Sequence, residues 1–120
     1  TQAKTLFPYT TLFRSMKECN QLVSLTIANT KWRLAEMKKA CEIINAQVVK
    51  GVKVHPRYLQ MCRALQTFTT TFDETVQVYS ESPSEVPERT LLYHMGKVSL
   101  LQSDLLEAAK EQVAILESKQ

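Results

Sequence analysis

The sequence predicts an all-α protein, a three-helix up-down-up antiparallel bundle with coiled-coil-like heptad packing. In three long stretches, apolar residues recur with an average spacing of 3.5 residues, which is the pattern of helices packed side by side. The chain has only two glycines and four prolines, and four of these six residues lie in or next to the breaks between these stretches. The connectors they mark are roughly five to seven residues long, so neighbouring helices are expected to run antiparallel.

Residues 1–15 are predicted to be a non-native leader outside the bundle. The segment 5–15 resembles the in-frame translation of a sequencing-library adapter over its whole length, and such segments are excluded from fold reasoning. The other interpretation is a genuine N-terminal arm in which Pro8 breaks regular structure. The single domain is therefore 16–120, and Met16 is either the first natural residue or an internal methionine of a longer protein.

The first helix is predicted over about 16–50. Lys50-Gly51 is typical of a helix end at which glycine adopts the left-handed capping conformation. The β-branched residues around this point are assigned to the helix end and the following loop. Thr30 and Asn20 are the polar members of the apolar seam, whose other members are Met16, Val23, Ile27, Leu34, Met37, Cys41, Ile44 and Val48.

The second helix is predicted over about 56–79. It begins at His55-Pro56, because proline fits the first helical turn, where its missing N–H would have no partner. The seam is rich in aromatic residues, and their helical spacing predicts a core rather than a ligand pocket. Its members are Tyr58, Met61, Cys62, Leu65, Phe68, Phe72, Val76 and Tyr79.

The third helix is predicted over about 84–118, with two possible starts. Ser82-Pro83-Ser84-Glu85 has the residue order of a capping box, whereas Pro87 argues for a start further along the chain. Gly96 within this helix indicates a close helix approach or local flexibility. The seam residues are Leu91, Met95, Val98, Leu101, Leu105, Ala108, Ala109, Ile115 and Leu116.

The unequal helix lengths predict surfaces for a partner. At 1.5 Å per residue, the first and third helices would be about 50 Å long and the second about 36 Å. Their free ends would then project past the second helix and expose apolar side chains, unless loops or kinks cover them. Trp32 lies off the seam, either at the bundle edge or facing outward, and tryptophan is enriched in binding hot spots. The predicted partner contacts are Leu22, Val23, Leu25, Trp32, Val113 and Leu116.

The sequence predicts no catalytic residue, cofactor or metal site. The candidate metal ligands lack the spacing that presents two side chains to one ion; they are His55, His94, Cys19, Cys41 and Cys62. Antiparallel pairing could bring Cys41 and Cys62 together. Three cysteines without paired spacing are nevertheless typical of free thiols used as small apolar residues, in a reducing compartment such as the cytoplasm.

Charge and hydropathy narrow the function class. The formal net charge is +3, and it falls to +1 without Lys4 and Arg14 of the leader, too little for a nucleic-acid footprint. No apolar run reaches the roughly 18–20 residues of a membrane span. The leading hypothesis is a small non-enzymatic protein–protein interaction or assembly module, with a second copy as one possible partner. The alternatives are a helical nucleic-acid-associated regulatory protein and the C-terminal fragment of an enzyme.

Overall fold

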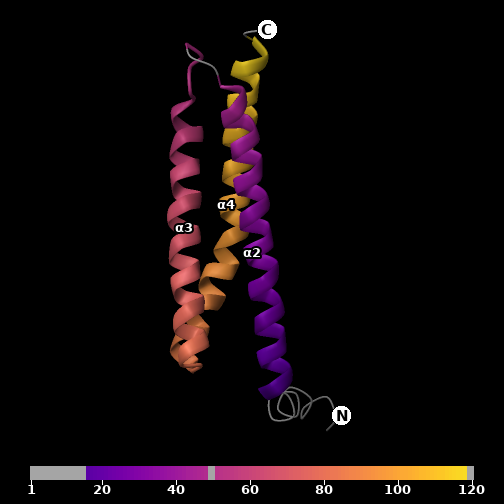
Figure 1. Ribbon diagram of the computed structural model, residues 1–120, viewed down its shortest axis with the longest axis vertical. Coiled ribbons are helices and arrows are strands. Elements are labelled where there is room, and N and C mark those ends of the chain that lie inside the picture. Colours follow the sequence, from indigo (N-terminus) through magenta and orange to yellow (C-terminus); the bar gives the residue numbers. More distant parts are fainter. Residues whose placement is uncertain (1–15, 49–50, 119–120) are drawn as a thin grey trace, which may run out of the picture.

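Three long helices form the described part of the molecule. The computed structural model describes residues 16–48 and 51–118, with side chains described from residue 21 onward. Its helices are α2 (Met16–Gln47), α3 (Pro56–Glu81) and α4 (Glu85–Ser118). Figure 1 shows α2 and α4 running in one direction and α3 in the other, and every pair of helices is in contact. The predicted three-helix up-down-up bundle is confirmed, whereas the predicted leader, 1–15, lies outside the described residues.

The connection between α2 and α3 contains the predicted glycine and proline, but α2 ends earlier than predicted. Helix α2 ends at Gln47, three residues before the predicted end. Gly51 has the expected positive φ of 95°, but it lies in the loop and not at the predicted capping position of the helix. His55 caps α3: its Nδ1 accepts a hydrogen bond from the backbone N–H of Arg57, 3.2 Å away, and Pro56 opens the helix. The capping imidazole satisfies one of the backbone donors that every helix start leaves without a partner.

The tight turn between α3 and α4 resolves the two alternative helix starts. The backbone N–H of Ser82 donates to the carbonyl of Val78 and ends α3, so Ser82 does not cap the next helix. Helix α4 begins at Glu85, and the N–H of Glu88 donates to the carbonyl of Ser84. Pro87 is accommodated in the first turn, because a proline there removes no hydrogen bond that the helix would make.

The core follows the predicted seams. On α2 the inward residues are spaced alternately by four and three, and the polar member, Thr30, is buried with its hydroxyl donating to the carbonyl of Thr26 at 2.8 Å. On α3 and α4 the side chains of Phe72, Leu91 and Val98 are fully buried. The buried apolar cluster consists of Val23, Leu34, Met37, Cys41, Tyr58, Leu65, Phe72, Tyr79, Leu91, Met95, Val98, Leu105 and Ala108.

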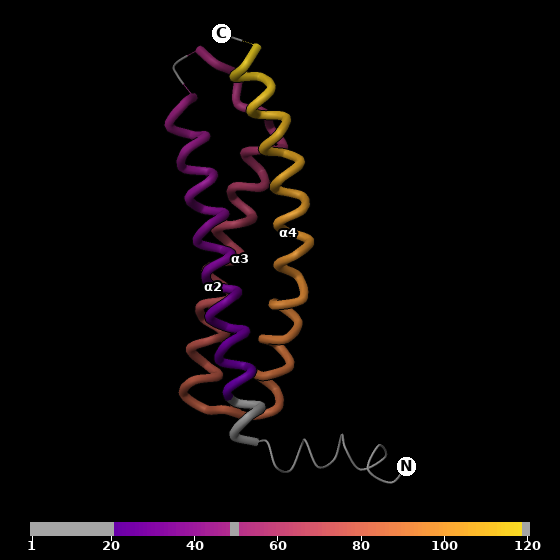
Figure 2. The backbone as a smooth tube through the Cα atoms, turned by 90° about the vertical axis from the view of Figure 1, so that its right-hand side faces the viewer, coloured from indigo at the N-terminus to yellow at the C-terminus, as the bar shows by residue number. Residues whose placement is uncertain are grey.

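The three helix pairs are packed unequally. Helices α3 and α4 make the most extensive contact, α2 and α4 an intermediate one, and α2 and α3 the smallest. In Figures 1 and 2, α4 lies beside both other helices along much of its length. The side of α2 that faces α3 is therefore the most loosely filled part of the bundle.

The predicted overhanging ends are wrong for Val23 and Leu116, which are both buried in the chain's own core. Two features remove the overhang. Helix α3 continues to Glu81, two residues beyond its predicted end, toward the start of α2. At the opposite end, the connection before α3 is hydrogen-bonded to α4 through Gln112. Loop packing and better-matched helix lengths thus cover seams that the periodic pattern left open.

Candidate protein-interaction surface

The outer face of α2 carries exposed large apolar side chains. Leu22, Leu25 and Trp32 are 62%, 67% and 62% exposed, and their spacing of three and seven residues places them on one side of the helix, turned away from the core. Ile43, also exposed, lies five full helical turns after Leu25 on the same side. We call these four residues the α2 outer stripe.

An apolar groove between α2 and α4 adjoins the stripe. It has a volume of about 220 Å³, and the small side chains Ala40 and Ala109 make it hollow. Glu36, four residues after Trp32, and Ala40, three before Ile43, line the groove, so the stripe and the groove are neighbours on the helix surface. The remaining lining residues are Met37, Cys41, Ile44, Gln102, Leu105 and Leu106.

A charged bridge marks the end of the groove nearest Trp32. The guanidinium of Arg33 donates to Oε1 of Gln102 at 2.6 Å and to Oγ of Ser99 at 3.1 Å. These bonds join α2 to α4 at the surface. Because Gln102 also lines the groove, the bridge borders the groove at that end.

The outer face of α4 is apolar as well. Val86, Tyr93 and Leu100 are exposed and recur every seven residues, so they share one face of the helix. The ammonium of Lys97 lies 5.2 Å from the centre of the Tyr93 ring, a cation–π geometry. Exposed apolar residues of this size on two adjacent helices are typical of surfaces that bind another protein.

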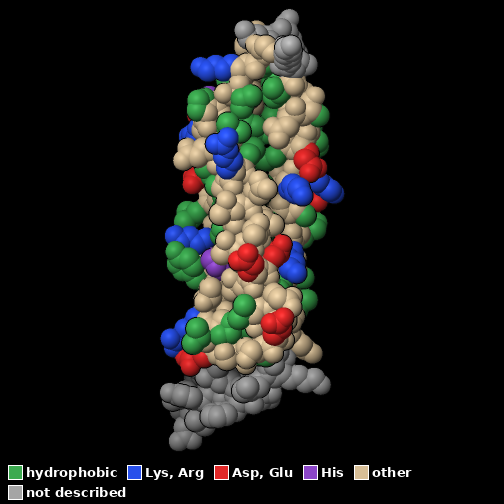
Figure 3. Space-filling view, turned by 60° about the vertical axis from the view of Figure 1, so that its left-hand side comes forward, with side chains coloured by type: hydrophobic (Ala, Val, Ile, Leu, Met, Phe, Trp, Pro, Cys, Tyr) green, Lys and Arg blue, Asp and Glu red, His purple; other side chains and the backbone are tan. Residues whose placement is uncertain are grey.

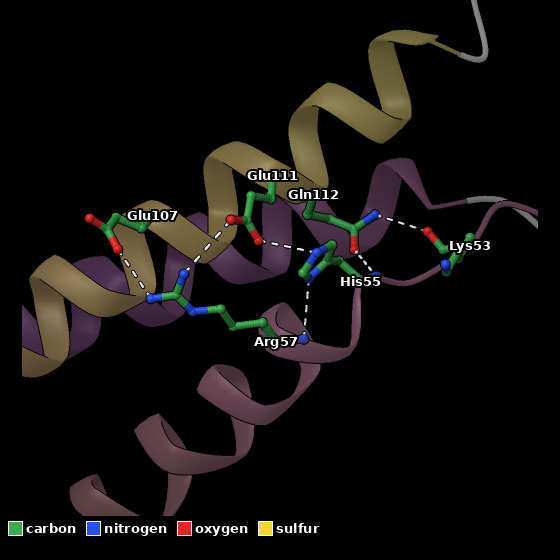
Figure 4. Close-up of polar contacts among 6 residues, drawn as sticks. All are labelled: Lys53, His55, Arg57, Glu107, Glu111 and Gln112. Atoms are coloured by element: carbon green, nitrogen blue, oxygen red, sulfur yellow. Dashed lines mark hydrogen bonds and ion pairs between the residues drawn. The ribbon is translucent and has the colours of Figure 1, made fainter.

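Figure 4 shows a polar cluster that ties the connection before α3 to α4. The fully buried Gln112 accepts from the backbone N–H of His55 at 2.6 Å and donates to the carbonyl of Lys53 at 3.2 Å. Arg57 forms ion pairs with Glu107 and Glu111 at 3.1 and 3.7 Å. This arrangement, the α4 clamp, gives hydrogen-bond partners to two part-buried backbone groups of the loop.

The α4 clamp is not arranged for acid–base catalysis. His55 Nδ1 accepts from the backbone N–H of Arg57, and Nε2 lies 3.1 Å from the Glu111 carboxylate. A histidine that accepts through Nδ1 carries its proton on Nε2 and donates it to the carboxylate. Both ring nitrogens are thus engaged within the protein, and neither is free to take a proton from a substrate.

The structure brings Cys41 of α2 and Cys62 of α3 to one cavity. This cavity has a volume of about 490 Å³ and is lined by both cysteines together with Leu65 and Asn45. The Tyr58 hydroxyl, one turn before Cys62, lies 3.2 Å from the Cys41 carbonyl oxygen and 2.9 Å from Oδ1 of Asn45. Burial, followed by the neighbouring Cys62, raises the pKa of Cys41 to about 12. Burial and the Cys62 thiol also raise the pKa of Tyr58 above its ordinary value.

Charged side chains are interspersed on the face that carries α3. Figure 3 shows acidic and basic groups alternating there without a continuous basic patch. Across the described residues, no three potential metal-ligating side chains gather in one place, and none of these helices is both long and apolar enough to cross a membrane. The two histidines have different contacts: His55 caps α3, whereas His94 packs edge-on against Phe68 with 5.7 Å between ring centres.

Of the six predicted partner contacts, the structure leaves Leu22, Leu25 and Trp32 exposed together, Val113 half-buried, and Val23 and Leu116 in the core. Residue 19 lies among those whose side chains are not described. The sequence reasoning missed the groove and the α4 clamp. Gln112 did leave a signal, because it occupies a seam position seven residues after Leu105, where a polar side chain needs a partner.

Comparison with protein-family models, with curated proteins and with solved structures finds no match to this chain.

Proposed function

We propose that this protein is a helical protein–protein interaction or assembly module that binds through the face formed by α2 and α4. The α2 outer stripe carries the proposal, because its four large apolar side chains are each more than three-fifths exposed. The adjacent groove supplies a hollow apolar surface into which a side chain of a partner helix can pack. Helix-in-groove recognition uses anchors at the same helical spacing that the stripe has.

We propose a second copy of the chain as the partner. Without the leader the net charge is close to zero, so two copies meet without strong repulsion. A two-fold arrangement would let the stripe of each copy contact the groove of the other, which makes the interface self-complementary. We also propose that the three helices within each chain pack in the left-handed, knobs-into-holes manner that their heptad spacing predicts.

The proposal includes no catalytic role and places the protein in a reducing compartment such as the cytoplasm. The engagement of both His55 nitrogens supports the first statement. The free thiols of Cys41 and Cys62 support the second. A nucleic-acid-associated role is a weaker candidate, because it needs a basic face, whereas acidic and basic side chains alternate on the face in Figure 3.

Light scattering over a concentration series of residues 16–120 tests the proposal. We expect a concentration-dependent dimer that Leu25→Lys and Trp32→Ala each weaken by at least tenfold, the effect of losing one hot spot of about 1.4 kcal/mol or more. Val78→Lys is the matched control, because Val78 is an exposed apolar residue of α3 outside the α2 outer stripe and the adjoining groove. A chain that stays monomeric at the highest concentration, or a dimer that Val78→Lys weakens equally, would contradict self-association through this face.

A further inference from the structure

The contact between α2 and α3 places two thiols opposite each other through the register of the helices. Tyr58 reaches both Cys41 and Asn45, which are four residues apart on α2. Cys62 follows Tyr58 by four residues, so the two lie on one face of α3. Because α3 runs antiparallel to α2 (Figure 1), moving from Tyr58 to Cys62 moves from the level of Asn45 to that of Cys41.

The surroundings of the two thiols differ in access. Cys41 is buried in the core, whereas Cys62 is half-buried at the core's edge. Both line the cavity of about 490 Å³ between the helices, whose other walls include the polar side chains of Gln66 and Thr70. A small polar reagent can therefore approach Cys62 from solvent, while Cys41 is reached only across the cavity.

We propose that Cys41 and Cys62 form a dithiol that a low-molecular-weight disulfide oxidises to an intrachain bridge, tying α2 to α3. The Cys62 thiolate attacks one sulfur of the oxidant, forming a mixed disulfide and releasing one thiolate. The Cys41 thiolate then attacks the Cys62 sulfur, forms the bridge and expels the second. The two cysteine protons end on the two released thiols, so the oxidant gains two electrons and the protein loses them.

The packing of this region makes such a bridge feasible. A disulfide needs the two Cα atoms within about 7 Å of each other, which is closer than most packed helices allow without movement. Helices α2 and α3 are the least extensively packed pair, and the cavity beside the thiols provides room for a small approach. The bridge would thus narrow this cavity and fix the loosest contact in the bundle.

Formation of the bridge is expected to be slow at neutral pH, because the Cys41 thiol is buried. Burial raises the pKa of the Cys41 thiol above its ordinary value, and only its thiolate can resolve the mixed disulfide. The rate of the second step is therefore expected to increase about tenfold for each unit of pH between 7 and 9. This places the pair among slowly responding dithiols rather than fast peroxide sensors.

The experiment treats the full chain carrying Cys19→Ser with oxidised glutathione and measures free thiols and intact mass after an acid quench. We expect both remaining thiols to disappear, the mass to fall by two hydrogens, and the midpoint of urea unfolding to rise. A dithiol reductant should return the midpoint to its original value. Adding Cys41→Ser should stop the reaction at a glutathione adduct on Cys62. Adding Cys62→Ser should leave Cys41 unmodified in the folded chain and reactive in urea.

Three results would overturn the inference. The first is a folded chain with both cysteines present that retains glutathione on Cys62 and a free Cys41 at pH 9. The second is a disulfide that links two chains rather than two helices of one. The third is a folded chain whose thiols both stay unreacted while the urea-unfolded chain is oxidised.

Discussion

The seam between α3 and α4 and the two sides of α2 are built differently. Along the α3–α4 seam, Phe72, Leu91 and Val98 are fully buried, and the α4 clamp fixes one end. Cavities lie on both sides of α2. Three cavities toward α3 adjoin one another. The cavity that holds the two thiols shares Asn45 and Cys62 with a cavity beside Tyr58, and it shares Lys38 and Thr69 with a cavity beside Leu34.

The side chains explain the difference. Large apolar residues face each other across the α3–α4 seam, and several of them are fully buried. Beside the core of α2 the flanking residues are long and charged or small, such as Lys38 and Ala40, and they leave space at the helix junctions. The α3–α4 hairpin is therefore expected to carry most of the stability, and α2 most of the surface available for binding and modification.

The largest effect is expected in the α3–α4 seam. Phe72→Ala should lower the free energy of unfolding by about 3–5 kcal/mol, because it removes a fully buried ring and leaves a cavity. Ile44→Ala, at a half-buried position beside the groove of α2, should cost only about 2 kcal/mol. Urea denaturation measures both, and equal costs would remove the difference between the two regions.

The α4 clamp should rank next. Gln112→Leu leaves the N–H of His55 and the carbonyl of Lys53 without their partner, at a cost of about 2–4 kcal/mol. Gln66→Leu is the matched control, since Gln66 is exposed beside the open α2–α3 cavity, and should change stability by less than about 0.5 kcal/mol. A neutral Gln112→Leu variant would show that water satisfies these groups as well as the side chain does.

Alkaline pH should lower the free energy of unfolding through Cys41, which lies between α2 and α3. Folding raises the pKa of Cys41 from 9.0 to about 12, so between these values the unfolded chain loses a proton that the folded chain keeps. The free energy of unfolding should then fall as pH rises from 9, by up to about 1.4 kcal/mol per unit from this group. Cys41→Ser should give a shallower pH dependence; identical slopes in both proteins would assign the loss to other groups.

The smallest effect on stability is expected at the α2 outer stripe. Leu25→Lys and Trp32→Ala should each change the unfolding free energy of the monomer by less than about 0.5 kcal/mol, because neither side chain is part of the core. A loss above about 2 kcal/mol in dilute solution would mean that the stripe supports the fold. It would then be unsuitable as a binding surface.

Periodicity and punctuation predicted the helices well, because both depend on local chemistry. The start of α3 at His55-Pro56 and the positive φ of Gly51 follow from residues that act on their own backbone. The register of the seams also anticipated that Cys41 and Cys62 could meet. Each of these features is determined within a few turns of one helix or by simple antiparallel pairing.

What the sequence could not predict depends on how elements pack against each other. The predicted overhang failed at Leu116 because the loop before α3 packs on α4, and at the opposite end, near Val23, α3 runs two residues further than predicted. No periodic pattern describes a loop or the exact end of a helix. The groove beside Ala40 depends on the spacing between α2 and α4, to which both helices contribute. Gln112 had a visible polar position in the seam, but its partners are backbone groups of a distant loop, which sequence spacing does not identify.

Native-state hydrogen exchange, measured at a concentration where light scattering gives the monomer mass, tests the difference between α2 and the α3–α4 hairpin most directly. Amides in helices that open locally exchange before those that open only on global unfolding. We predict that the central amides of α2, around Leu34, exchange at least tenfold faster than those around Phe72 and Val98. Equal protection in all three helices, or slower exchange in α2, would contradict the account.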